Sequence, residues 1–287
     1  NKYPMDEYRL IRDYQNGEII FDRRYGSTKT FEKNNYPVGY NLGQSGNTPS
    51  QNLVDAYEMI DGTPFDWNNP EHKSNPYANR DPRLAMSILT NNVEFKDRTI
   101  EAWTGGRDGK GVIHATRTGY YIYKFIDPNL DLLQNRTSVH HWVIMRYAEI
   151  LLSYAEAMNE AYGPTGNVGY RLNAVRALNQ VRNRVGVEMP AVPTAISKEE
   201  LREKIRNERR VELAFEDHRF WDVRRWMIAP ETLGAPLRGV EITKISDEEF
   251  EYKPIEVEKR TFEPKMYLYP IPQADLNTTG WVQNPLW

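Results

Sequence analysis

Two amphipathic helices joined by a short loop are the feature that most constrains the fold. Apolar side chains recur every three or four residues from Val143 to Tyr162, and Gly163-Pro164 ends that pattern. A second pattern of the same spacing covers Leu172 to Val185 and stops at Gly186. Neither helix can bury its apolar stripe alone, so the pair predicts a helical hairpin that packs on further structure.

A third predicted helix carries the densest charge in the chain. Ser197 and Glu200 have the spacing of a capping box, which predicts a helix that starts there and runs to about Arg219. Glu208 and Glu212 lie one turn apart on its apolar face, so we expect both carboxylates to be partly buried. Such a pair could act as general acid and base, but burial without cationic partners is costly, which favours an ion-pair network. The candidate partners are Arg182, Arg184, Arg209 and Arg219.

The sequence divides into three regions. Residues 1–143 are rich in Asn, Gly, Pro and Asp, with only short extended runs such as Glu18–Phe21 and Gly119–Phe125. Residues 144–230 form the helical region, and residues 231–287 carry two more extended stretches, Ile255–Glu258 and Met266–Pro272. We expect the last region to pack on the same domain. The predicted fold is mainly α, with tetratricopeptide-like helical hairpins, long irregular loops and a few short strands.

Composition removes several classes of function. The chain has 287 residues, with 37 Lys and Arg against 40 Asp and Glu, and this balance does not favour nucleic acid as a partner. No apolar run is long enough to cross a bilayer within this sequence. The absence of cysteine excludes disulfides, iron–sulfur clusters and thiolate zinc sites. We therefore expect neither a metal nor another cofactor.

Three segments imitate ligand motifs without completing them. Asp127, Asn129 and Asp131 offer oxygen ligands at alternate positions, but the glycine and the glutamate of a calcium loop are missing downstream. His140-His141 lacks a third spaced ligand. The glycine-rich run 105–111 lacks the Lys-Ser/Thr ending of a phosphate-binding loop. We expect a turn, ordinary packing and a flexible hairpin tip at these three places.

Aromatic residues in loops are the remaining chemical resource. Aromatic faces stack on the C–H face of a sugar ring, while amide and guanidinium groups bind its hydroxyls. The candidate glycan contacts are Trp67, Asn68, Tyr77, Trp103 and Arg107. The alternative is that the three aromatic residues among them pin long loops to the core. Packing is also the role expected of the tryptophans beside the helices, Trp142, Trp221 and Trp226.

Several segments together resemble the SusD/RagB family. In the helical region they are Met145–Ala157, Leu178–Arg184, Glu208–Glu216 and Asp222–Trp226. Elsewhere they are Leu53–Met59, Asp81–Arg83, Thr118–Phe125, Tyr267–Pro272 and Gln283–Pro285. These segments agree with the family in order and spacing, and they span nearly the whole chain.

The resemblance implies a non-catalytic, glycan-binding lipoprotein on the outer-membrane surface of a Gram-negative bacterium. Such proteins capture glycans and pass them to a SusC-like, TonB-dependent transporter. Family members are roughly twice as long, so we expect this chain to be the C-terminal half. The N-terminal half and its lipidated cysteine, the only membrane anchor, are then missing from it. The resemblance transfers no ligand residue, and it assigns a packing network to Arg146, Glu149, Glu208, Arg209 and Glu212.

Two rival functions stay open at this stage. A tetratricopeptide-like adaptor would bind only protein, and the helical hairpin would allow this. A glycoside hydrolase would use two carboxylates, and the sequence offers many acids but no loop motif that pairs two of them. Sugar binding without turnover would select the glycan-binding subunit.

Overall fold

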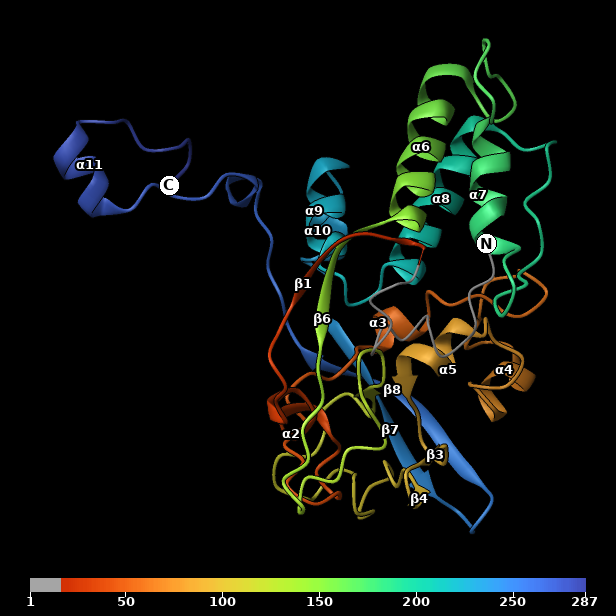
Figure 1. The fold of residues 1–287 in the computed structure, drawn as a ribbon, viewed down its shortest axis with the longest axis vertical. Helices are drawn as coiled ribbons and strands as arrows, with labels where there is room; N and C mark the ends of the chain where they lie inside the picture. The colour runs from red at the N-terminus through yellow and green to blue at the C-terminus, as the bar shows by residue number, and fades with distance from the viewer. Residues whose placement is uncertain (1–16) are drawn as a thin grey trace.

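Short elements precede long helices in the structure, a computed structural model that describes residues 17–287 (Figure 1). The short elements are β1 (Ile19–Arg24), α2 (Thr30–Asn35), α3 (Gln51–Val54), α4 (Pro70–Ser74), α5 (Arg83–Ser87), β2 (Ile88–Leu89), β3 (Glu94–Phe95), β4 (Arg98–Thr99), β5 (Tyr121–Ile122) and β6 (His141–Arg146). They are followed by α6 (Tyr147–Tyr162), α7 (Ala174–Arg182), α8 (Lys198–Glu212), α9 (His218–Arg225), α10 (Ala229–Thr232), β7 (Leu237–Lys244), β8 (Phe250–Glu258), the 3-10 helix η1 (Pro264–Tyr267) and α11 (Gln273–Thr279). Helices hold 31% of the described residues and strands 15%, so the fold is mainly α, as predicted.

Helices α6, α7 and α8 pack side by side at one end of the molecule (Figure 1). They enclose an apolar cluster that includes Met158, Leu178 and Ile205. Helix α6 ends at Gly163, whose φ of 75° suits a residue without a side chain. Helix α8 begins with the capping box of Ser197 and Glu200. The predicted hairpin and these two helix boundaries are confirmed.

Strand β6 occupies residues that the periodicity assigns to the first helix. Residues 143–146 pair antiparallel with β1, which places Val143 opposite Asp22. Helix α6 therefore begins only at Tyr147. Pairing with the distant strand β1 outweighs the helical spacing of the apolar residues in this segment. Its β-branched side chains also favour a strand. The predicted extended run 119–125 contributes only two residues, which form β5.

Helices α7 and α8 are shorter than predicted. Helix α7 ends at Arg182. Helix α8 ends at Glu212 and does not reach Arg219. Phe215 and Asp217 have φ angles of 65° and 62°, in the left-handed region that does not continue a helix. The chain turns at these residues and continues as α9.

The loop-rich half folds around buried tyrosine and aliphatic side chains. From residue 17 onward, its regular strand pairing consists of three two-stranded sheets, β1–β6, β2–β5 and β3–β4. The Tyr36 hydroxyl donates a hydrogen bond of 2.5 Å to the carbonyl of Asp127. The Tyr40 hydroxyl likewise donates to the carbonyl of Phe95 over 2.8 Å. Tyrosine hydroxyls thus tie separate segments of the loop-rich half together through backbone carbonyls.

The C-terminal segment has two unlike parts. Strands β7 and β8 form an antiparallel hairpin against α3 and α4, and β8 contains the predicted strand 255–258. Beyond it the chain leaves the body, and α11 lies apart from the other elements (Figure 1). Tyr269 and Trp281 are 59% and 62% exposed there. Met266, predicted to be extended, lies in η1.

Candidate functional site

A network of buried ion pairs joins the loop-rich half to the helices. Arg83 on α5 reaches across to α8, where its Nη1 lies 2.5 Å from Glu208 and 2.9 Å from Glu212. Arg146, at the end of β6, lies 2.7 Å from Glu212 and 2.7 Å from Glu216. All five side chains are buried. The predicted burial of the two glutamates on α8 is confirmed.

The charge state of Glu212 argues against a role as general acid. Burial alone would raise the pKa of this carboxyl, but Arg184, Arg146 and Arg83 outweigh burial and hold the pKa well below its ordinary value. A general acid at neutral pH needs a raised pKa instead. The arrangement therefore supports a structural ion pair at this position.

Sequence reasoning found some of the partners of these glutamates. Arg182 lies 2.7 Å from Glu208, and Arg184 lies 2.5 Å from Glu212, as expected. The other two expected partners are wrong. Arg209 pairs with Asp222 of α9 at 2.9 Å. Within residues 17–287, no ion pair joins Arg219 to either glutamate. The chain turns after Glu212, and this turn places Arg219 on α9 instead of on α8.

Trp67 and Asn68 lie on the loop between α3 and α4. The Trp67 indole N–H donates to Asp55 Oδ1 over 3.0 Å, and the edge of its ring meets Phe65 with 5.1 Å between ring centroids. Its ring is half-buried. Asn68 is exposed, and its amide donates to Asp66 over 2.9 Å. This loop offers one partly accessible indole face beside an amide.

Tyr77 and Trp103 are the two ends of a row of aromatic rings. Trp103 packs on Phe250 with 5.3 Å between ring centroids, and Phe250 lies 6.4 Å from Tyr252. Tyr252 in turn meets the edge of Tyr77 at 5.3 Å. Phe250 and Tyr252 were missed by sequence reasoning, although their spacing of two residues on a strand places both on one face. The fold thus connects two of the predicted sugar contacts through strand β8.

A cavity of about 1000 Å³ opens beside this row. Its lining includes Tyr77, Phe250 and Tyr252 together with the amides of Asn75 and Asn91. Of the predicted contacts, Tyr77 lines this cavity, whereas Trp67, Asn68, Trp103 and Arg107 are outside its lining in the described part of the chain. Aromatic faces next to amides suit a sugar ring and its hydroxyls.

The remaining predicted contact, Arg107, sits at an exposed loop tip. Its guanidinium lies 2.5 Å from Glu101. The three predicted aromatic residues, Trp67, Tyr77 and Trp103, all pack against the buried cluster of the loop-rich half. These rings therefore pin loops to the core, and their half-buried state leaves part of each ring accessible.

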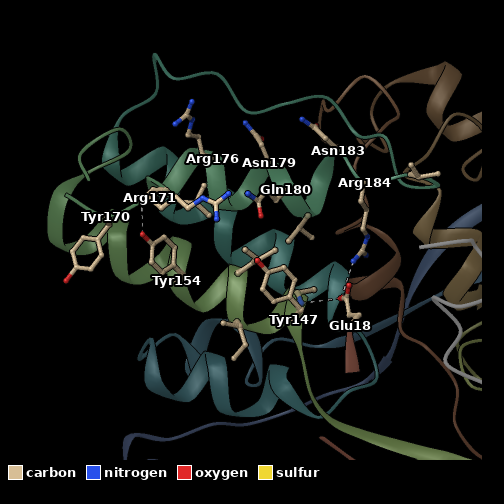
Figure 2. A pocket seen from close by; sticks show the side chains of 16 residues that line it. Glu18, Tyr147, Tyr154, Tyr170, Arg171, Arg176, Asn179, Gln180, Asn183 and Arg184 are labelled. Atoms are coloured by element: carbon tan, nitrogen blue, oxygen red, sulfur yellow. Dashed lines mark hydrogen bonds and ion pairs between the residues drawn. The ribbon is translucent and has the colours of Figure 1, made fainter. Parts of the chain in front are cut away.

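A second cavity, of about 1180 Å³, lies along the hairpin of α6 and α7. Figure 2 shows Tyr147 and Tyr154 from α6 facing Asn179 and Gln180 from α7, with Tyr170 at one end and Arg184 at the other. The Tyr154 hydroxyl donates to the carbonyl of Leu172 over 2.8 Å. Sequence reasoning did not select these residues, because their periodicity was assigned to packing.

The tryptophans beside the helices have different surroundings. Trp142 packs on Phe125 with 5.4 Å between ring centroids. Trp226 is held by Glu156, which accepts its indole N–H at 2.7 Å. The packing role is confirmed for these two, but it is wrong for Trp221, which is 58% exposed on α9.

The three incomplete ligand motifs hold no metal cluster in the described residues. Asp127 accepts hydrogen bonds from the Asn129 N–H at 3.1 Å and from the Ser138 hydroxyl at 3.0 Å, so this segment is a turn, as predicted. Throughout residues 17–287, no group of three or more potential ligands converges as a metal site would require. None of the helices in this range combines the length and apolar character of a membrane span.

One family accounts for all of the described chain. The SusD family model matches residues 17–287. This chain belongs to the SusD family. Among solved structures it is similar to a SusD-like protein from Bacteroides fragilis, with 31% identity and a TM-score of 0.80. That match covers 99% of this chain and 57% of the solved chain.

Two further SusD relatives extend the comparison. A SusD-like carbohydrate binding protein from Bacteroides fragilis is 30% identical with a TM-score of 0.75, over 91% of this chain and 53% of that one. SusD-like protein P2 from Formosa agariphila is 34% identical over 120 residues, which are 40% of this chain and 22% of the relative. The chain thus spans little more than half of the solved relatives and a smaller share of the curated one.

Proposed function

We propose that this chain is part of a non-catalytic glycan-binding subunit of an outer-membrane nutrient uptake system. Membership of the SusD family is the observation that carries the proposal, and one solved relative is itself described as carbohydrate binding. In this role the protein sits at the cell surface, lipid-anchored in its full-length form. It delivers a polysaccharide or oligosaccharide to a SusC-like, TonB-dependent transporter.

The proposed sugar site is the cavity beside the aromatic row. Tyr77 and Tyr252 supply ring faces, while Asn75 and Asn91 supply amide donors and acceptors for hydroxyl groups. The neighbouring loops extend this surface toward the other proposed contacts, Trp67, Asn68, Trp103 and Arg107. A stacked ring contributes about 1–2 kcal/mol through apolar burial, so several sugar units along a polymer would be needed for firm binding.

A protein-binding adaptor is the second candidate, and the cavity along α6 and α7 favours it. Tyr147 and Ile150 of α6 are 38% and 41% exposed, one turn apart on the helix. An exposed apolar stripe with this spacing suits an amphipathic helix as partner. This function would leave the cavity at Tyr77 without a ligand.

Affinity electrophoresis in gels that contain single polysaccharides tests the first candidate against the second. We expect one polymer to retard the wild-type chain, and we expect Tyr77→Ala to weaken retention about 5–30-fold through loss of the stacked ring. The matched control is Tyr170→Ala, because Tyr170 is 53% exposed and lines the other cavity. Thermal melts confirm that both variants fold.

The same mixtures are assayed for released oligosaccharides. Retention without product supports binding without turnover, whereas product formation would overturn the non-catalytic assignment. Loss of retention in Tyr170→Ala alone would move the sugar site to the hairpin. If no polysaccharide retards the chain or a full-length version of it, the glycan proposal fails.

A further inference from the structure

The cavity beside the aromatic row is lined by one buried hydroxyl that has no hydrogen-bond partner in the described residues. It belongs to Thr90, which directly follows strand β2 and is 8% exposed. From residue 17 onward, no donor or acceptor of the protein engages the Thr90 side chain. Side-chain hydroxyls this deeply buried normally bond to the protein. An open hydroxyl in the wall of a cavity therefore marks a point at which a ligand can bond.

The polar groups next to Thr90 also have hydrogen-bonding capacity to spare. Tyr252 is buried, and its hydroxyl accepts the Asn91 amide N–H at 3.5 Å. In the described part of the chain, the hydroxyl proton of Tyr252 has no acceptor. Asn91 Oδ1 accepts the backbone N–H of Ala102 at 3.1 Å, which holds the amide in place. This part of the lining thus offers uncharged donors and acceptors, as a ligand rich in hydroxyls requires.

The cations in the lining are poorly placed to bind an anion. Arg80 is buried, and its Nη atoms donate to three backbone carbonyls at 2.6, 2.6 and 2.7 Å. Its Nε atom is buried as well. Lys73 of α4 is the other cation in the described lining, and it is exposed. A negative ligand would therefore meet one accessible lysine and no accessible guanidinium group.

Glutamates outnumber that lysine. Glu248 and Glu249 lie at the tip of the β7–β8 hairpin, and Glu251 lies on β8. All three line the cavity and are exposed, and none forms an ion pair within residues 17–287. Asp81, the remaining acid of the described lining, is paired with Arg83 at 2.6 Å. Like charges repel within about 10 Å at moderate salt, so this rim disfavours a carboxylated or sulfated ligand.

We propose that this cavity binds an uncharged saccharide unit through the Thr90 hydroxyl, and that Glu248 and Glu249 disfavour anionic units. This ligand class rests on the proposed function and narrows it to neutral glycans. The rings of the aromatic row stack on the apolar face of the unit, while Thr90 and Asn91 bond its hydroxyls. A buried protein hydroxyl discriminates against a unit that has no group to bond it, because the protein hydroxyl is then left unpaired.

Thr90→Val tests the hydroxyl contact in affinity gels that contain the neutral polysaccharide retained by the wild-type chain. Valine keeps the shape of the side chain and removes the hydroxyl. We expect retention to weaken about 3–10-fold, which corresponds to the loss of one hydrogen bond. Because the hydroxyl bonds no other described residue, the melting temperature should equal or exceed that of the wild type.

Thr116→Val is the matched control. Thr116 is 6% exposed and outside the described lining of this cavity. Its hydroxyl accepts the backbone N–H of Thr118 at 3.1 Å and of Gly119 at 3.2 Å. This variant should have a lower melting temperature and unchanged retention when both variants are assayed well below their melting temperatures. Unchanged retention in Thr90→Val, or a lowered melting temperature in that variant, would overturn the contact.

The charge of the ligand is tested with the same polysaccharide after part of its primary hydroxyls have been oxidised to carboxylates. The wild-type chain should retain the oxidised polymer about threefold less than the neutral one, and this difference should shrink as salt screens the exposed charges. Glu248→Gln combined with Glu249→Gln should raise retention of the oxidised polymer relative to the neutral one. Glu199→Gln combined with Glu203→Gln, at exposed positions of α8, changes the net charge equally and should not. Equal or stronger retention of the oxidised polymer by the wild type, or an equal effect of the two double variants, would overturn the neutral class.

Tyr77→Ala separates failure of the Thr90 contact from failure of glycan binding. If Tyr77→Ala weakens retention and Thr90→Val does not, glycan binding stands and the Thr90 contact is wrong. If neither the neutral nor the oxidised polymers retard the wild-type chain or a full-length version of it, the proposed function fails and the ligand class falls with it.

Discussion

The helical region and the loop-rich half bury different kinds of side chain. The cluster among α6, α7 and α8 is aliphatic, with Leu152 and Leu178 both fully buried. The loop-rich core instead buries tyrosines, whose hydroxyls bind backbone carbonyls of distant segments. Helices satisfy their own backbone groups, whereas loops need side-chain donors. A chain with long loops therefore needs amphipathic side chains in its core, which explains why several of its tyrosines are buried in the loop-rich half.

The junction between the two regions is charged. Arg83 comes from the loop-rich half and Arg146 from the end of β6, and both insert into the row of glutamates on and after α8. Each ion is buried and has more than one partner, so removing a single member leaves others without countercharge. We infer that the two regions fold and unfold together through this network, and the following predictions test the difference between them.

Acid should have the largest effect, because it acts on the whole junction. Burial would raise the pKa of Glu216, but Arg146 and Lys124 outweigh it and lower the pKa, as the arginines do for Glu212. Carboxylates with depressed folded-state pKa values stabilise the fold above their unfolded-state pKa, and this contribution is lost as pH falls below about 4.5. The urea midpoint should therefore fall steeply from pH 5 to pH 3.

Site-resolved data would show whether the junction is the acid-sensitive part. Hydrogen exchange at pH 4 should accelerate first at the C-terminal end of α8, near Glu212, and later at the aliphatic cluster around Leu178. A midpoint that does not change between pH 5 and pH 3 would contradict the role given to the glutamates.

Arg83→Ala is the next largest perturbation. It leaves Glu208, Glu212 and Asp81 with an uncompensated share of buried negative charge, since Arg83 contacts all three. We expect a loss of about 3–5 kcal/mol in the free energy of unfolding, measured by urea denaturation at pH 7.

An exposed ion pair of the same chemistry provides the control for Arg83. Arg202 lies 2.6 Å from Glu160, and both side chains are partly exposed. Arg202→Ala should cost less than about 1 kcal/mol, because water screens the pair. Equal losses in the two variants would mean that burial does not matter at the junction.

Leu178→Ala probes the helical region alone. Leu178 is 0% exposed in the cluster of α6, α7 and α8, so its truncation removes apolar contacts and leaves a cavity. We expect a loss of about 2–4 kcal/mol in the free energy of unfolding, with no change in its pH dependence between pH 5 and pH 7. A shifted pH dependence would show that the aliphatic cluster and the junction are not separable.

The two regions also differ in how far the sequence predicts them. The periodicity of Met158 and Leu178 and the capping box at Ser197 locate helices because their information is local. The partners of Glu208 and Glu212 were only half predicted. Arg83 lies more than a hundred residues upstream in a loop-rich stretch. No local pattern carries that pairing.

The candidate site likewise depends on residues that are far apart in the sequence. Loop chemistry pointed to Tyr77 and Trp103, but strand β8, which carries Phe250 and Tyr252 to them, enters from the far end of the chain. The turn after Glu212, set by left-handed residues, redirects Arg219 away from the position that an uninterrupted helix would give it. Contacts between residues far apart in the sequence therefore determine the candidate site, whereas local sequence patterns determine the helices that support it.

The smallest expected effect compares one hydroxyl in each region. Tyr36 donates to the carbonyl of Asp127 at 2.5 Å and of Leu130 at 3.2 Å in a buried setting, so Tyr36→Phe should cost about 1–2 kcal/mol in the free energy of unfolding. Tyr154 makes one such bond, 2.8 Å to Leu172, on the half-buried helix face, where water can replace the lost donor. Tyr154→Phe should therefore cost less than about 0.5 kcal/mol. Parallel urea denaturation of the two variants measures the difference. Equal costs would show that the tyrosine hydroxyls of the loop-rich core contribute no more than a hydroxyl of the helical hairpin, and the contrast between the two interiors would then rest on the ion pairs alone.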